Sequence, residues 1–277
     1  MSIAELSYLF SQQFMVRAMI VGLLVSLCAA LLGISLVLKR YSMIGDGLSH
    51  VGFGTLAIAA ALNLAPLPVS MVLVVLAAFL LLRISGNSKI KGDAAIALIS
   101  TSSLAIGSLV ISLTTRSNAD VCNFMFGSIV VMTDSDLYLS IALCAVVLML
   151  FVLFYNKIFA VTFDETFAQA TGTKTKLYNM LLAFLTAVTI VLGMRMMGAL
   201  LISSLIIFPA LTSMRVCKHF KAVTVCAAIV SVLCFTLGIV LSIWFNVLPG
   251  PSVVVVNIVA FLLFWGIHLL QGKGFFA

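Results

Sequence analysis

The chain alternates between long apolar stretches and short polar or proline-containing connectors from residue 14 to residue 270. A helix needs about 20 apolar residues to cross the hydrocarbon layer of a membrane. The pattern predicts nine membrane spans, or eight if one of the two that almost meet at residues 194–199 is short or broken. The predicted spans are residues 14–38, 43–62, 67–84, 94–113, 137–155, 177–194, 199–214, 222–245 and 252–270.

The connectors and the composition agree with this division. The sequences LAPLP at residues 64–68 and LPGPS at residues 248–252 place helix breakers between apolar runs. Hydrophobic residues make up 64% of the chain and charged residues 8%, whereas soluble domains carry about 25% charged residues. The sequence therefore predicts an all-α, polytopic membrane helix bundle in which residues 1–277 form a single transmembrane domain.

The basic residues are distributed unevenly between alternate connectors. If the first connector is cytoplasmic, that side receives most of the 15 Lys and Arg residues. These are Lys39, Arg40, Arg83, Lys89, Lys91, Lys157, Lys174, Lys176, Arg215, Lys218, Lys221 and Lys273. Only Arg17, Arg116 and Arg195 fall on the other side. Cytoplasmic loops carry an excess of Lys and Arg, so we expect the N-terminus outside and the C-terminus in the cytoplasm. The net charge of +7 then reflects topology and needs no nucleic-acid partner.

Asp46 and His50 interrupt the second apolar stretch, GDGLSHVGFGTLAIAAALNL. An ionisable side chain inside a membrane span is costly and marks a candidate functional site. A spacing of four residues places both side chains on one helix face. A carboxylate beside an imidazole suits zinc, manganese or ferrous iron. The pair is therefore a candidate metal-binding or proton-handling site, and the structural alternative is a buried hydrogen bond that holds two helices together.

Small residues surround this pair. Gly45, Gly47, Gly52 and Gly54, with Ser49 between them, remove bulk on the sides that flank Asp46 and His50. Small residues let helices approach closely in lipid and also permit local unwinding beside a cavity. Either outcome brings the pair close to a second helix or to its counterpart in another copy.

A connector at residues 156–176 contains the sequence VTFDETFAQATGTK. Phe163 and Phe167 are four residues apart, Asp164 and Glu165 fall in the first helical turn, and Gly172 supplies a stop signal. The pattern predicts one short amphipathic helix parallel to the membrane. This helix is either a tethered surface element or a docking element for a cytoplasmic partner, and the residues leave both open.

Other chemistry is not indicated. The sequence contains no G-x-x-x-x-G-K-[ST] phosphate loop and no H-E-x-x-H motif. The six cysteines are scattered through apolar stretches without a C-x-x-C pair, which favours packing over a disulfide framework or a thiolate site. We expect no catalytic residue and no covalently bound cofactor. A pump of this kind must take its energy from another chain or from an ion gradient.

Three segments resemble one known family. Residues 45–50, GDGLSH, resemble the G-D-x-L-S-H signature of the zinc/manganese/iron ABC importer permeases. Residues 198–210, GALLISSLIIFPA, are similar to its G-A-L-L-x-S-A-L-L-x-x-P-A run, and residues 163–168, FDETFA, to its F-D-x-x-F-A segment. The motifs occur in the same order and cover nearly the whole chain. One departure is Gly52-Phe53-Gly54, where many relatives have Pro-Gly shortly after the histidine.

The resemblance implies a transport subunit of a bacterial-type plasma membrane that pairs with itself. It also implies two separate cytoplasmic ATPase subunits and an extracytoplasmic solute-binding protein as partners. On this basis we expect Asp46 and His50 to bind the transported metal, and Phe163, Asp164, Glu165 and Phe167 to couple the chain to the ATPase. A two-fold dimer then supplies up to four N and O ligands.

The expected function is ATP-driven uptake of a divalent transition metal, with zinc favoured and manganese or iron possible. Pro209, inside the seventh predicted span, is a candidate hinge because proline frees a backbone carbonyl within a helix. The alternative is a gradient-driven cation carrier in which Asp46 and His50 relay protons. An intramembrane hydrolase with His50 as base is a weaker alternative, since no matching nucleophile is found.

Overall fold

The computed structural model describes residues 12–87, 92–114 and 134–270, and every regular element in these ranges is a helix. The helices are α2 (Gln13–Leu38), α3 (Ile44–Ala61), α4 (Pro66–Asn87), α5 (Gly92–Leu113), α7 (Asp134–Leu153), α8 (Tyr155–Phe163), α9 (Glu165–Ala170), α10 (Thr175–Met197), α11 (Ala199–Val216), α12 (Phe220–Phe245) and α13 (Pro249–Leu270). The predicted all-α membrane bundle is confirmed.

Eight of the described helices are long and apolar enough to cross a membrane. They are α2, α4, α5, α7, α10, α11, α12 and α13, and each begins and ends within a few residues of a predicted span. The remaining predicted span corresponds to α3, an 18-residue helix that is not among the eight. Its Asp, His and four glycines lower its apolar content.

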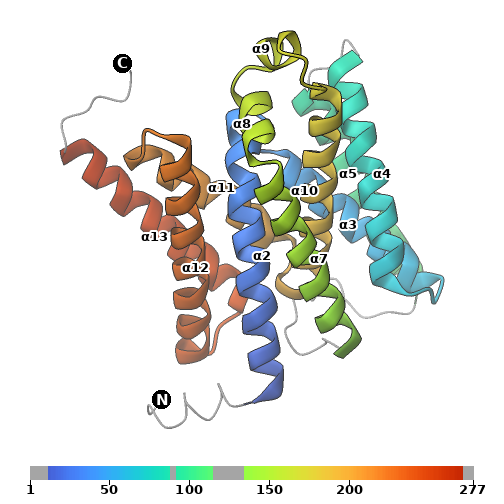
Figure 1. Ribbon diagram of the computed structural model, residues 1–277. Helices are drawn as coiled ribbons and strands as arrows, with labels where there is room; N and C mark the ends of the chain where they lie inside the picture. Colours follow the sequence, from blue (N-terminus) through green and yellow to red (C-terminus); the bar gives the residue numbers. More distant parts are fainter. Residues whose placement is uncertain (1–11, 88–91, 115–133, 271–277) are drawn as a thin grey trace.

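Helix α2 is central to the bundle. It packs against α7, α10, α11 and α12, and Figure 1 shows α12 and α13 on one side of it and α3, α4 and α5 on the other. The approach to α11 is very close, because a Cβ atom added to Gly33 would lie 1.9 Å from the backbone oxygen of Ile206. Glycine is therefore required at residue 33 for this packing.

Helix α3 is enclosed by α4, α5, α10 and α11, and most of its residues are buried. Its glycines permit this enclosure. A Cβ atom at Gly47 would lie 2.5 Å from Cγ2 of Ile96, and one at Gly54 would lie 2.6 Å from the backbone oxygen of Ser103. The prediction that small residues let a second helix approach is confirmed, and α3 is one continuous helix through Gly52-Phe53-Gly54.

The two spans that almost meet in the sequence are separate helices. Gly198 alone lies between α10 and α11, with φ of 85°. This region of backbone conformation is readily adopted only by glycine, so a single residue is enough to turn the chain. Helix α10 extends three residues beyond its predicted end at Met194 and ends at Met197.

The connector at residues 156–176 differs from its prediction. It forms two short helices, α8 and α9, because Asp164 adopts an extended conformation with φ of −146° and ψ of 99°. Asp164 is the N-cap of α9, and its carboxylate accepts a hydrogen bond from the Phe167 N–H at 2.9 Å. The prediction of one short helix that contains both Phe163 and Phe167 is therefore wrong, because Phe163 ends α8 and Phe167 lies in α9.

The predicted stop at Gly172 is confirmed. Gly172 has φ of 81° and its N–H donates to the Gln169 carbonyl at 3.0 Å, while the Thr173 N–H donates to the Ala168 carbonyl at 2.9 Å. This pair of bonds is a Schellman motif. It closes α9 and directs the chain into α10.

Helices α8 and α9 lie at the same end of the bundle as the C-terminus of α2 (Figure 1). An ion pair between Lys39 and Glu165, with Nζ and Oε2 3.4 Å apart, joins the two connectors directly. The two segments that the charge pattern assigns to one face therefore do share a face. Which compartment this face meets stays a prediction, and Lys89, Lys91, Arg116 and Lys273 lie outside the described residues.

Candidate metal site and coupling surface

The Asp46–His50 pair lies near the start of α3. Asp46 is in the first turn of the helix and His50 follows one turn later. The Nε2 atom of His50 is 3.5 Å from Oδ2 of Asp46. The Asp46 side chain is 45% exposed and that of His50 is 22% exposed, so the two groups converge and remain accessible.

The position of Asp46 has a local cause. The prediction placed this residue well inside a span, whereas it falls in the first turn of α3. The first backbone N–H groups of a helix have no intrahelical acceptor, and the helix dipole favours negative charge there. The start of α3 is thus a favourable place for a carboxylate in an otherwise apolar bundle. Ser49 supports the turn by donating to the Asp46 carbonyl at 2.7 Å.

A third polar group reaches the pair from α11. The Ser203 side chain lies beside the Asp46 carboxylate, and its hydroxyl donates to the Ala199 carbonyl at 3.1 Å. Ser203 is 8% exposed. The neighbouring Gly45 faces α11 as well, since a Cβ atom there would lie 3.1 Å from Cδ1 of Ile206. The pair therefore lies at the α3–α11 interface.

Sequence reasoning did not assign a role to Ser203. The available signal was its place in the GALLISSLIIFPA run, which carried the family resemblance. Spacing along the chain does not reveal that this run lies beside residues 45–50, because the contact joins segments more than 150 residues apart.

The geometry of the pair suits a metal ion. Zinc binds imidazole nitrogen and carboxylate oxygen at about 2.0–2.2 Å, so two ligand atoms of a tetrahedral ion lie about 3.4 Å apart. The Nε2–Oδ2 distance of 3.5 Å matches this separation. Among the residues that the structure describes, no third His, Cys, Asp or Glu joins the pair. The pair thus offers two ligand atoms, and a four-coordinate ion has two further positions.

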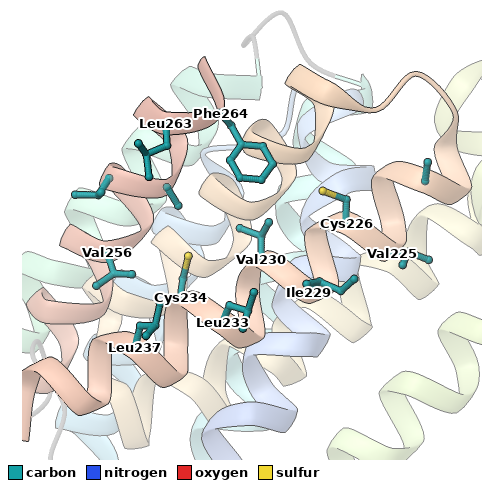
Figure 2. A pocket seen from close by; sticks show the side chains of 13 residues that line it. Val225, Cys226, Ile229, Val230, Leu233, Cys234, Leu237, Val256, Leu263 and Phe264 are labelled. Carbon is teal, nitrogen blue, oxygen red and sulfur yellow. The ribbon is translucent and has the colours of Figure 1, made fainter. Parts of the chain in front are cut away.

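A cavity elsewhere in the bundle has different chemistry. A cavity of about 580 Å³ lies between α12 and α13, and its lining residues are all apolar apart from the thiols of Cys226 and Cys234. Figure 2 shows these two cysteines among Leu233, Val256 and Phe264. The lining of this cavity offers no carboxylate or imidazole. The Asp46–His50 pair is therefore the better candidate for a hard or borderline metal ion.

The described cysteines are all free, and Cys28, Cys144 and Cys234 are buried. This agrees with the packing role that the sequence predicts. Cys122 lies outside the described residues.

The predicted coupling residues divide into two groups. Phe163 and Phe167 are each 65% exposed at the end of the bundle. Asp164 lies between them, and its pKa is lowered because its carboxylate accepts hydrogen bonds from the Phe167 N–H and the Thr166 hydroxyl. Glu165 differs from these three, since its carboxylate binds Lys39 and Asn179 of the same chain.

Aromatic packing holds Phe163 in place without covering it. Its ring centroid is 5.0 Å from that of Phe159 and 6.4 Å from that of Phe220. These contacts attach the end of α8 to the start of α12. Phe163 and Phe167 thus expose their rings on either side of the capped turn at Asp164.

Pro209 lies inside α11 and is buried. Helix α11 is continuous across it, from Ala199 to Val216. Because proline has no N–H, the carbonyl one turn earlier loses its helical donor. The hinge role stays a prediction.

The described helices form a polytopic membrane protein with an accessible carboxylate–imidazole pair inside it and exposed phenylalanine rings at one end, features that suit a transport protein. The comparison with protein families agrees: the model of the ABC 3 transport family matches residues 11–267. The chain belongs to this family.

Named relatives cover nearly the whole chain. It is 30% identical over 249 residues to the manganese import system permease protein ScaB of Streptococcus gordonii, covering 90% of this chain and 89% of that one. It is also 30% identical to the high-affinity zinc uptake system membrane protein ZnuB of Haemophilus influenzae, with coverage of 89% and 94%. The solved structure of PsaBC from Streptococcus pneumoniae in complex with Fab matches with a TM-score of 0.85 and 30% identity, over 95% of each chain.

Family membership settles three expectations. The chain is a transport component and not an enzyme, with ATP hydrolysis on a separate ATPase. It is a multi-pass membrane protein. The resemblance to metal ABC importer permeases that three short motifs indicated is confirmed.

Proposed function

We propose that this chain is the permease subunit of an ATP-driven importer for a divalent transition metal, with zinc favoured. The observation that carries the proposal is the 3.5 Å separation of His50 Nε2 and Asp46 Oδ2. Two neighbouring ligands of a tetrahedral ion need this spacing. Relatives named for manganese, zinc and iron transport support the substrate class.

The residues do not select one metal among these three. Carboxylate and imidazole serve all of them, and intrinsic affinity follows the Irving–Williams order and not cellular demand. Manganese and iron therefore remain candidates beside zinc.

The proposed assembly is a homodimer in the plasma membrane, with the C-terminus and the α8–α9 segment in the cytoplasm. Two copies of Asp46 and His50 near the dimer axis supply four ligand atoms, the number that a tetrahedral ion requires. Two ATPase subunits bind the surface formed by Phe163, Asp164 and Phe167. A solute-binding protein delivers the metal from the opposite side.

Transport requires that this site release its ion. A site completed by two subunits changes its affinity when the subunits move, because the ligands from one chain separate from those of the other. Binding that is weak or incomplete in one conformation permits conduction. Helix α11 takes part in the motion, since it holds Ser203 beside Asp46 and contains Pro209, the proposed hinge.

Reconstitution separates this function from the gradient-driven alternative. The unmodified permease and its ATPase are placed in proteoliposomes with metal-loaded binding protein, and uptake of zinc, manganese and iron is measured with and without ATP. We expect uptake that needs both ATP and the ATPase. Uptake by the permease alone under a proton gradient would replace the proposal with a carrier in which Asp46 and His50 relay protons.

A further inference from the structure

Three polar side chains meet where α2 ends. The Lys39 ammonium, at the C-terminus of α2, lies 3.4 Å from Glu165 Oε2 of α9. It also donates to the amide oxygen of Asn179 on α10. The Asn179 amide nitrogen in turn donates to Glu165 Oε1 at 2.8 Å. We name these three residues the α9 clamp, because they join α9 to two long helices.

The α9 clamp is more than a surface ion pair. The Lys39 side chain is only 10% exposed, whereas that of Glu165 is 48% exposed. Burial lowers the pKa of Lys39, and the neighbouring Glu165 carboxylate opposes this effect. A buried ammonium is costly unless it is paired and hydrogen-bonded. Its position is explained by the two acceptors that it finds there, and by the favourable field at a helix C-terminus.

The rest of α9 has few other attachments to the long helices. It is six residues long with only Ala168 buried, and it packs mainly against α8 and α10. Phe163 and Phe167 on either side of Asp164 are exposed. The α9 clamp is therefore the polar link between this segment and α2.

Helix α2 continues the connection toward the metal site. It packs tightly against α11 at Gly33 and Ile206, and α11 carries Ser203 beside Asp46. A displacement of α9 that is transmitted to α2 thus reaches an element in contact with the candidate ligands. The packed helices α2 and α11 and the hydrogen-bonded side-chain cluster form a contiguous physical network of the kind that carries energetic coupling.

We propose that Lys39, Glu165 and Asn179 are positioning residues that fasten α9 to α2 and α10, so that ATPase-driven movement of α9 reaches the metal site. This proposal rests on the proposed function. It gives Glu165 a different role from Asp164, Phe163 and Phe167, since Glu165 acts inward on its own chain. The Lys39 side chain is only 10% exposed, so it acts through Glu165 and not by touching the ATPase.

The first test uses the assembled transporter. Lys39→Met and Glu165→Gln each remove one charge of the α9 clamp. We expect both complexes to retain bound ATPase while metal uptake per ATP hydrolysed falls by about 2- to 30-fold, the range that mutations in coupling networks produce. Lys39→Arg should keep most of the ratio, because it preserves the charge and the donors. Lys218→Met, which removes an exposed lysine on the same predicted face, is the matched control and should behave as the unmodified protein.

The second test is a charge reversal. In Lys39→Glu with Glu165→Lys, the Asn179 amide can rotate so that its oxygen accepts from the new lysine and its nitrogen donates to the new glutamate. We expect the double variant to restore at least half of the uptake-to-ATP ratio that each single reversal loses. A non-additive double-mutant cycle is the signature of direct interaction.

Three results would overturn the proposal. One is normal coupling in Lys39→Met, another is loss of ATPase binding in Glu165→Gln alone, and the third is additive loss in the reversed pair. The second result would assign Glu165 to the ATPase interface. Failure of the proposed function is distinguishable, because it appears in the unmodified complex as uptake that does not depend on ATP. In that case the same double-mutant cycle can be measured as the thermal stability of the permease alone. It then still tests whether Lys39 and Glu165 interact.

Discussion

In both the Asp46–His50 pair and the α9 clamp, a carboxylate oxygen lies within 3.5 Å of a basic nitrogen. The two clusters differ in whether their polar atoms remain free to bind a further ligand. In the clamp, Lys39, Glu165 and Asn179 bind one another, and the central ammonium is nearly covered. The Asp46–His50 pair is half open, and its two atoms are separated by the distance that a shared metal ion needs. A closed cluster fixes elements in place, whereas an open pair can accept a ligand.

The origin of the two clusters also differs. Asp46 and His50 are neighbours on one helix, so their approach is set by helical geometry alone. The Lys39–Glu165 contact joins residues 126 positions apart and exists only while α2, α9 and α10 keep their arrangement. The Asp46–His50 distance should therefore change little when the helices move relative to one another, whereas the Lys39–Glu165 contact should break or form with that movement.

Removing the ligands should give the largest effect. Asp46→Asn and His50→Ala should each abolish metal uptake, because each removes a metal ligand. Expression and assembly with the ATPase should persist, because both side chains are partly exposed and neither belongs to the coupling turn. Uptake into proteoliposomes and copurification of the ATPase measure the two properties. If the pair were only a structural hydrogen bond, Asp46→Asn would preserve uptake, since an amide can still pair with imidazole.

Reversing the charge of the coupling turn should give the next largest effect. Asp164→Lys with Glu165→Lys should leave the chain inserted and dimeric, yet abolish stimulation of ATP hydrolysis by metal-loaded binding protein. The physical reason is twofold: α9 loses its N-cap, and the clamp places two ammonium groups together. Glu165→Lys alone disrupts the clamp and keeps the Asp164 N-cap. Its loss of stimulation should therefore equal the part of the double variant's loss that comes from the clamp. Unchanged metal uptake in the double variant would remove the coupling assignment.

Substitution of Ser203 should have an intermediate effect, and it tests whether the Asp46–His50 pair depends on helix α11. The Ser203 side chain lies beside the Asp46 carboxylate, and mutation of groups next to metal ligands typically changes metal affinity by 10- to 100-fold. We expect Ser203→Ala to raise the KM for metal uptake by about tenfold, at the low end of that range, with kcat less affected. Ser204→Ala is the matched control, because the Ser204 hydroxyl donates to the Leu201 carbonyl at 2.8 Å within its own helix. Equal effects of both substitutions would indicate general weakening of α11.

Much of the fold could be predicted because its signals are local. Apolar length sets the long helices, the glycines of α3 predict close packing, and the four-residue spacing of Asp46 and His50 fixes their shared face. The break between α8 and α9 was missed although its signal was also local. Asp164 is both acceptable in a first helical turn and a strong N-cap residue, and only the backbone shows that the second preference prevails.

The remaining features depend on contacts between distant segments. Neither Ser203 beside Asp46 nor the grouping of Lys39 with Asn179 follows from periodicity, since each needs the packing of particular helices. The charge pattern predicts Lys39 only as a cytoplasmic charge, yet its side chain is nearly covered in the folded chain. A positive residue that serves topology can thus serve a second purpose once the bundle is formed.

The smallest effect should come from the cap of α9. Asp164→Ala removes the acceptor that binds the Phe167 N–H at 2.9 Å, so we expect faster hydrogen exchange at residues 165–168 and a loss of ATPase stimulation of about twofold, the lower limit for coupling networks. Asp164→Asn should be close to the unmodified protein, because asparagine is an equally good N-cap. This pair of variants separates the cap from the charge. If Asp164→Asn lost as much stimulation as Asp164→Ala, the carboxylate would act through its charge on the ATPase, and the coupling turn would depend on electrostatics instead of backbone geometry.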